Sequence, residues 1–186
     1  MTASDSLEII QSVRERRLIT LGLADQVAEE RWREAILPGG RTAHAMLAHL
    51  LAWDEWLTAV LELSALRPLP EKLKQPLRDV DAFNGRSIVR FDGLPRQDLL
   101  MGLQGASVRL VSALTASGGG WASRRIPDLA PSRTRPDGQP SRGPSVGGLL
   151  RTLREHEREH DEEFSAVFGV TVDLEQLREQ ARERGG

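Results

Sequence analysis

The chain has 186 residues, of which 39% are hydrophobic and 28% are charged, and its formal net charge is −2. This length and composition are typical of one globular domain, and the small net charge argues against nucleic acid or acidic lipid as a partner. The sequence contains no Cys. Disulfides, thiolate metal sites and a protein thiol nucleophile are therefore excluded.

The most apolar segment, at residues 43–63, is interrupted by two His and three acidic residues. This pattern predicts a buried helix rather than a membrane span. Residues 1–11 have neither the basic start nor the apolar stretch of a secretory signal. We therefore expect a cytoplasmic protein that contacts no membrane.

The first helix is expected to begin at residues 4–6, where Asp5 and Glu8 have the spacing of a capping box. Its apolar pattern continues weakly through residues 25–37 and stops at Pro38 and two glycines. Thr42 then has the position of an N-cap for a second, strongly apolar helix that reaches about Ser64.

Residues 67–76 contain three prolines and are expected to form a connector. A third helical region is predicted to begin near Asp79 and to bend around residues 92–95, after which leucines recur at helical spacing. A fourth helix is expected at residues 145–168, and a short polar helix at residues 174–184 closes the chain.

Residues 118–148 hold seven Gly, five Pro and five Arg but only two acids. So long a loop is uncommon in a compact domain. We interpret the arginines either as solvated linker charges or as part of a mobile lid that grips a carboxylate-bearing thiol cofactor. The arginines are at positions 124, 125, 133, 135 and 142.

No segment alternates as a strand does, so the sequence predicts an all-α fold. We expect a four-helix bundle with up-down-down-up topology and a long loop, at residues 117–147, before the last helix. The bundle is expected to span residues 1–170, and residues 171–186 to form a short C-terminal helix or tail. Dimers are common among such bundles, so a homodimer is left open.

Two histidines one turn apart, His156 and His160, fall on the apolar stripe of the last long helix, together with Leu149, Leu153 and Phe164. Side chains at i and i+4 lie on one side of a helix, about 5–6 Å apart at Cβ. Two imidazoles so placed are able to share one metal ion. The remaining face of this helix, rich in Glu, Asp and Arg, is expected to be solvated.

His49 shares a face of the second helix with Ala45, Ala52, Trp53 and Trp56, so it is also expected to point inward. A single histidine on such a face is more often a hydrogen-bonded core residue. Three of them instead favour a shared divalent ion, because each buried imidazole left unsatisfied costs about 1–3 kcal/mol. His44 lies about 140° further round the helix and is expected to be exposed.

Three neutral nitrogen ligands leave open positions on a metal, as in a catalytic site. Imidazole suits zinc, nickel, copper and iron alike. A di-iron site is not expected, since Glu-x-x-His occurs only at residues 157–160, whereas ferritin-like proteins use it twice.

Three segments resemble the DinB/YfiT-like metalloenzyme superfamily. The run TAHAMLAHLLAWDE at residues 42–55 is similar to its second-helix motif, and HEREH at residues 156–160 to its last-helix motif. The run DAFNGR at residues 81–86 looks like the subgroup named for DfsB and ClbS. A tryptophan commonly precedes the Ser or Thr that opens the second helix, whereas this chain has Arg41.

The resemblance implies a four-helix bundle with one divalent metal, zinc or nickel, held by His49, His156 and His160. Relatives include S-transferases that use a low-molecular-weight thiol such as mycothiol or bacillithiol, maleylpyruvate isomerase relatives, and a hydrolase. The resemblance also makes Asn84 and Arg86 candidate pocket residues. The difference at Arg41 suggests a different entrance to the site.

Trp53 and Trp56 flank His49, and they either fill the core or form the wall of an apolar substrate pocket. The sequence therefore predicts an enzyme in which a metal activates a thiol or water for transfer to, or hydrolysis of, a small electrophile. Two alternatives stay open. One is a non-catalytic metal- or ligand-binding bundle that acts in stress or sequestration, and the other is a metal-free interaction module.

Overall fold

The computed structural model of the protein describes residues 3–64, 68–118, 120–129 and 142–185. Within these ranges all regular structure is helical, with seven α-helices, four short 3-10 turns and two isolated bridges in place of strands. The all-α prediction is therefore confirmed.

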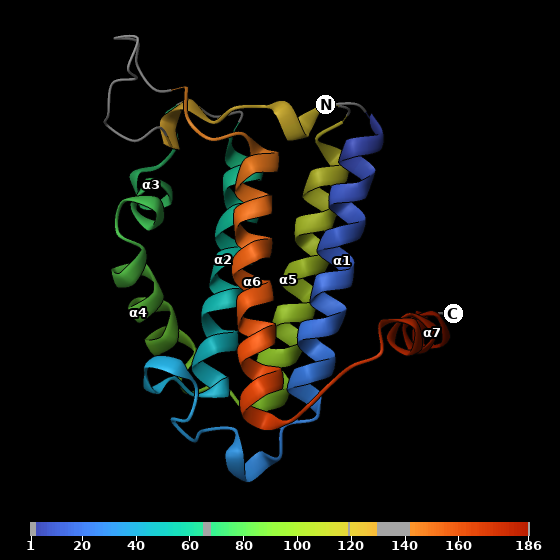
Figure 1. Ribbon diagram of the computed structural model, residues 1–186. Helices are drawn as coiled ribbons and strands as arrows, with labels where there is room; N and C mark the ends of the chain where they lie inside the picture. The colour runs from blue at the N-terminus through green and yellow to red at the C-terminus, as the bar shows by residue number, and fades with distance from the viewer. Residues whose placement is uncertain (1–2, 65–67, 119, 130–141, 186) are drawn as a thin grey trace.

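Four long helices lie side by side (Figure 1): α1 (Ala3–Asp25), α2 (Ala43–Leu63), α5 (Arg96–Ala116) and α6 (Val146–Phe168). α1 and α6 run in one direction, and α2 and α5 run in the other. α2 packs along α5, and α1 packs along both α6 and α5. Two apolar clusters fill the space between them, one around Leu57, Leu110 and Leu150 and the other around Met46, Leu99 and Phe164.

The ends of α2 and α6 lie where the sequence predicts them, because local side chains satisfy the backbone there. Thr42 Oγ1 accepts a hydrogen bond from the Ala45 amide at 2.9 Å, and Ser145 Oγ accepts one from the Gly148 amide at 3.1 Å. Gly169, with φ of 67°, ends α6 in the left-handed conformation that glycine adopts without strain.

The weak continuation of the first helix through residues 25–37 was a wrong prediction, since α1 ends at Asp25. Arg96 Nη2 donates 2.9 Å hydrogen bonds to the carbonyl oxygens of Ala24 and Asp25, which caps the last turn of α1. The guanidinium also lies over the ring of Trp32, 4.7 Å from its centroid. Trp32 is thereby buried against the end of α1 instead of extending it.

The predicted connector at residues 67–76 also differs, because it contains the start of a helix, α3 (Glu71–Arg78). Pro76 is the sixth of its eight residues, so its missing N–H removes only one intrahelical bond, and Leu73 and Pro76 are buried. α4 (Val80–Phe91) follows at once and begins beside Asp79, as expected. Asp79 caps it, since its Oδ1 accepts a hydrogen bond from the Ala82 amide at 3.0 Å. These two helices flank the four long ones (Figure 1).

Only parts of the predicted long loop lie within the described residues, and Arg133 and Arg135 lie outside them. Residues 120–129 form two short turns, η3 (Trp121–Ser123) and η4 (Pro127–Leu129), which bury Trp121 and Ile126 in the core. The Ile126 amide bonds to the Pro144 carbonyl at 3.0 Å, which holds this segment beside the start of α6. These parts of the loop therefore cover one end of the four long helices.

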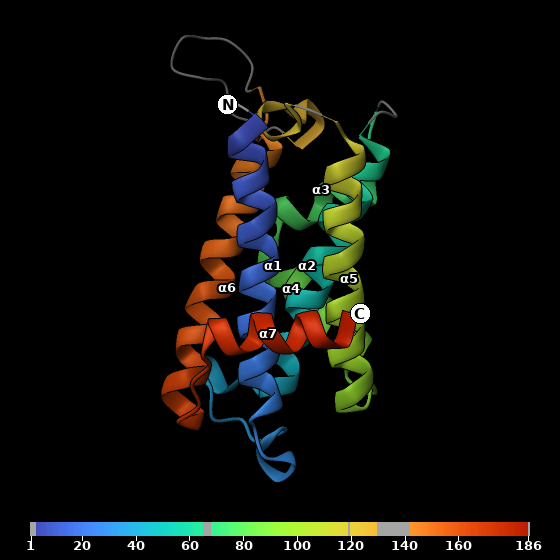
Figure 2. The same cartoon turned by 90° about the vertical axis from the view of Figure 1, so that its right-hand side faces the viewer.

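α7 (Leu174–Gly185) crosses α1 on the outside of the molecule (Figure 2). The close approach depends on Gly22, where an added Cβ would lie 3.0 Å from methyl groups of Leu177 and Val172. Arg178 forms an ion pair with Glu15 of α1.

One helix in the described part of the chain, α5, is long and apolar enough to cross a membrane by length and composition alone. Its most apolar window has a mean hydropathy of 1.3 and is 39% buried. Leu99, Leu103, Leu110 and Leu114 of this helix are buried against neighbouring helices, which is typical of a core helix.

Candidate metal centre

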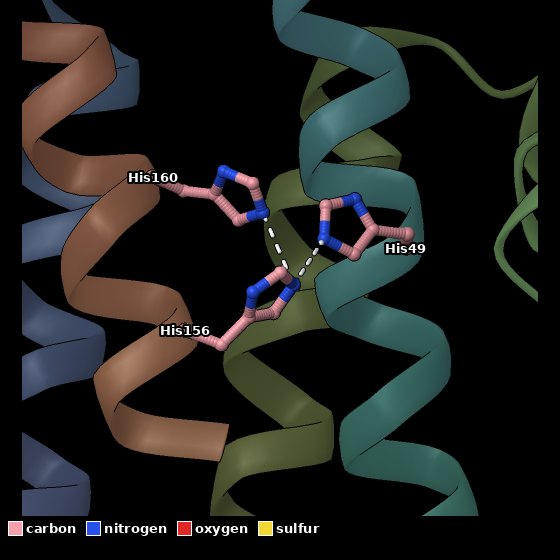
Figure 3. Close-up of side chains that lie close together, drawn as sticks. All are labelled: His49, His156 and His160. Carbon is pink, nitrogen blue, oxygen red and sulfur yellow. Dashed lines mark hydrogen bonds between the residues drawn. The ribbon is translucent and has the colours of Figure 1, made fainter. Parts of the chain in front are cut away.

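The three predicted histidines converge between α2 and α6. Figure 3 shows the ring of His49, from α2, and the rings of His156 and His160, from α6, pointing toward one another across the space between the helices. His49 and His160 are each 3% exposed, and the side chain of His156 is 36% exposed. The periodicity of both helices thus predicts the inward direction of these side chains correctly.

The nitrogen atoms lie at distances that suit one metal ion. His156 Nε2 is 3.3 Å from His49 Nε2 and 3.1 Å from His160 Nε2, and the three donor atoms all lie within 4.8 Å of one another. Zn–N bonds of about 2.0–2.1 Å in a tetrahedral site separate two nitrogen ligands by roughly 3.3 Å. The three side chains are therefore close enough to bind a metal ion.

The other ring nitrogen of His160 has its own hydrogen-bond partner, so its Nε2 is available to face the centre. His160 Nδ1 lies 2.9 Å from Glu163 Oε2, and because a carboxylate only accepts, the ring donates there. For His49, hydrogen bonding to the backbone of Ala45 opposes the lowering of its pKa. One metal ion at the centre would accept all three Nε2 lone pairs, whereas without an ion the 3.1 and 3.3 Å contacts are hydrogen bonds whose donor depends on the tautomer of each ring.

The electrostatics of the site keep the histidines neutral, as metal ligands must be. Burial lowers the pKa of His49 well below its usual value, and the other two rings lower it further. Burial also lowers the pKa of His156 and of His160, although the hydrogen bond that His160 donates to Glu163 opposes this for His160. At pH 7 none of the three rings therefore needs to lose a proton before it binds a metal.

Arg41 and Glu163 form a second layer of contacts that the sequence did not reveal. Arg41 Nη2 lies 2.9 Å and 3.1 Å from the two carboxylate oxygens of Glu163, and Arg41 Nε donates to the Pro38 carbonyl at 2.9 Å. Glu163 in turn holds the ring of His160, an arrangement that orients metal-binding histidines in many proteins. The signal available in the sequence was the i,i+3 spacing of His160 and Glu163.

A cavity of about 660 Å³ adjoins the site on the side of His156. Trp53 and Trp56 belong to the apolar core and also line this cavity, so they meet both of the interpretations that the sequence left open. Asn84 lies behind this wall, where its Oδ1 accepts a 3.0 Å hydrogen bond from Trp53 Nε1. Arg86 lines a different groove, with Glu55 and Lys72, so the structure does not bring it to this cavity.

His44 was expected to be exposed, but it is 1% exposed. Its Nε2 lies 3.1 Å from the Leu94 carbonyl oxygen, which accepts the ring proton. The turn before α5 covers the first turn of α2, a long-range contact that helical spacing does not report. His44 is thus a satisfied core histidine and does not belong to the metal site.

The face of α6 that looks toward α1 was expected to be solvated, yet Glu157 and Asp161 are buried. They belong to an ion network with Arg16, Arg17, Thr20 and Asp54. Arg17 Nη2 donates to Asp54 Oδ2 at 2.7 Å, and Arg17 Nη1 lies 3.1 Å from Glu157 Oε1. Two acidic residues of α6, Glu157 and Asp161, are therefore buried and form ion pairs with arginines of α1.

Thr20 links two of the three acids of this network, because its Oγ1 lies 2.8 Å from both Glu157 Oε1 and Asp161 Oδ1. A hydroxyl has one hydrogen, so one of these contacts requires a protonated carboxyl group. Burial raises the pKa of Asp161 to about 7, with the charge of Glu157 adding to the rise. Burial likewise raises the pKa of Asp54 to about 6, although Arg17 opposes it.

The chain matches no family model, no curated protein and no solved structure. The resemblance to the DinB/YfiT-like superfamily therefore depends on the three sequence segments alone, and membership stays a prediction.

Proposed function

We propose that the protein is a divalent-metal-dependent enzyme of the DinB-like type, built on a four-helix bundle, in which His49, His156 and His160 hold one Zn²⁺ or Ni²⁺. The observation that carries this proposal is the convergence of three Nε2 atoms, two pairs of them at 3.1 and 3.3 Å, beside an apolar cavity. The directions of the four long helices in Figure 1 also support it.

Three neutral ligands leave an ion open positions, at which it lowers the pKa of a thiol or of water, or polarises a carbonyl. The protein's own residues position and shield this chemistry. Glu163 fixes the ring of His160, and Trp53 and Trp56 exclude water from one side. Because the chain has no Cys, a sulfur nucleophile would come from a low-molecular-weight thiol such as mycothiol or bacillithiol.

The substrate that fits this proposal is a small electrophile, to which the thiol is transferred or which water hydrolyses. We further propose that the protein acts in the cytoplasm without a nucleic-acid or membrane partner. The net charge of −2 and the buried leucines of α5 support this. A homodimer is compatible with the fold.

Metal analysis of protein purified without an affinity tag tests the first step. We expect about one divalent ion per chain, lost in His49→Ala and in His160→Ala. His44→Gln is the matched control, because His44 is equally buried on the same helix but bonds to Leu94. Metal retained in both ligand variants, or lost equally in the control, would refute the proposed centre.

Turnover assays test the second step. Metal-loaded protein is incubated with mycothiol, bacillithiol, glutathione or no thiol and a panel of small electrophiles, and product is measured against the His160→Ala variant. Metal-dependent product formation supports the enzyme. Stoichiometric metal binding without turnover would favour the alternative, a metal-binding bundle that sequesters its ligand.

A further inference from the structure

The cavity beside His156 has a wall made of apolar side chains from four helices. These are Trp53 and Trp56 of α2, Leu77 of α3, Val80 of α4, and Leu149 and Leu153 of α6. Its volume of about 660 Å³ falls within the range of about 300–1,000 Å³ that is usual for small-molecule sites.

The polar ends of both tryptophans point away from this cavity. Trp53 Nε1 donates to Asn84 Oδ1 at 3.0 Å, and Trp56 Nε1 donates to the Leu73 carbonyl at 2.8 Å. Trp53 also packs edge-on against Trp56, with ring centroids 5.3 Å apart, and against Phe83 at 4.6 Å. The indoles therefore offer the cavity rigid apolar surface and no hydrogen-bond donor.

Leu77 and Val80 extend this wall into solvent, being 37% and 45% exposed. Both flank the junction of α3 and α4, where Asp79 caps α4. Their exposure leaves apolar surface that an occupant of the cavity would cover.

The polar lining lies at the edges, on α6. His156 borders the cavity on the side of the metal centre, and Glu155, Glu159 and Arg151 lie on the exposed side of the helix. No charged side chain among the described lining residues stands in the wall opposite them. A charged group placed against the apolar wall, away from the charged side chains at the edge, would therefore lose hydration without gaining a partner there.

We propose that the cavity binds the electrophilic substrate, and that this substrate is an uncharged molecule with a flat apolar body, aromatic or conjugated. Its body lies against Trp53, Trp56, Leu77 and Val80, and its single polar reactive group faces His156. This inference depends on the proposed function for the role of substrate, but the binding site and the ligand class are tested separately from the metal.

Three probes of one shape and different charge test the ligand class: 2-naphthylmethanol, 2-naphthoate and 2-naphthylmethylammonium. Binding is measured by calorimetry and by the shift of the Trp53 indole N–H signal in NMR, assigned with Trp53→Phe. We expect the neutral probe to bind at least about 10-fold more tightly than either ion, with the Trp53 signal shifting. Equal or tighter binding of an ion, or an unmoved Trp53 signal, would overturn the proposal.

Leu77→Glu and Val80→Glu test the wall. Each is expected to weaken binding of 2-naphthylmethanol by about 10-fold or more, as loss of a buried Leu or Val contact does. Val89→Glu is the matched control, since Val89 is 77% exposed on α4 but does not line the cavity. Unchanged affinity in both wall variants, or an equal loss in the control, contradicts the assignment.

Zinc titration of the same samples separates the two proposals. Protein that binds zinc but does not discriminate among the probes keeps the proposed metal centre and overturns the proposed ligand class. Protein that selects the neutral probe at Trp53 but binds no zinc keeps the binding site and overturns the proposed enzyme.

Discussion

The two buried faces of α6 differ in how their polar groups are satisfied. Toward α1, Glu157 and Asp161 meet Arg16, Arg17 and Thr20, so that every charge has an opposite charge or a hydroxyl beside it. Toward α2, His156 and His160 meet His49, and His156 Nε2 lies 3.3 Å from His49 Nε2 and 3.1 Å from His160 Nε2. The first cluster pairs acidic side chains with arginines, whereas the second brings together three nitrogen atoms that are close enough to bind a metal ion.

This comparison separates a structural polar cluster from a binding site. Breaking the ion network should lower the stability of the protein and leave metal binding intact. Breaking the histidine cluster should weaken metal binding and leave the stability of the metal-free protein intact. α6 carries residues of both clusters, so variants at neighbouring positions test them in the same background.

The largest expected effect is on stability. Arg17→Met removes the cation that Asp54 and Glu157 share, and leaving buried charges unpaired costs about 3–5 kcal/mol. Urea unfolding measures this loss. The control is Arg14→Met, at an exposed position on the same helix, which should change the free energy of unfolding by no more than about 0.5 kcal/mol. A loss below about 1 kcal/mol would mean that the network is dispensable.

The next effect is on metal affinity. His49→Ala should weaken zinc binding by about 100-fold or more, which corresponds to about 2.7 kcal/mol, because one of three ligands is lost. It should also abolish the rise in Tm that zinc gives the wild type. Competition titration with a chromophoric chelator measures the affinity, and unchanged affinity would exclude His49 as a ligand.

Glu163→Gln should weaken zinc binding by about 10–100-fold, as the loss of a carboxylate that orients a ligand usually does. Glu159→Gln is the matched control, because Glu159 Oε2 lies 4.0 Å from His156 Nδ1, beyond hydrogen-bond distance, and is largely exposed. Isothermal titration of both variants distinguishes them, and an equal effect would show a general charge effect instead of positioning.

The smallest effect is on the pH dependence of metal-free protein. Burial lowers the pKa of His49 in the folded state. Below about pH 6.5 the unfolded chain therefore binds a proton at this histidine that the folded protein does not bind, and the stability of the fold decreases. Burial raises the pKa of Asp54 to about 6, so as pH falls through that value the folded state binds a proton that the unfolded chain does not. This adds stability.

His49→Ala should therefore lessen the loss of stability between pH 7 and pH 5.5, by up to about 1.4 kcal/mol per pH unit. Asp54→Asn should steepen it. Urea midpoints across this range, in the presence of a chelator, measure both slopes. Slopes that change in the same direction in the two variants would contradict the opposite signs.

The sequence alone determined the boundaries of α2 and α6 and the inward direction of His49, His156 and His160. Caps such as Thr42 and Ser145 and the 3.6-residue period act within one helix, so a single segment carries the information. The same reasoning placed Trp53 and Trp56 beside the site.

Only the tertiary structure decided which polar residues are buried and what they touch. His44 meets Leu94, Arg41 meets Glu163, and Glu157 meets Arg17, across 50, 122 and 140 residues of chain. Such partners are chosen by how helices pack, and the charged pattern of a helix face is the same whether water or an opposite charge lies against it. The three histidines could be recognised from the pattern within each helix, but the contact of Arg41 with Glu163 could not.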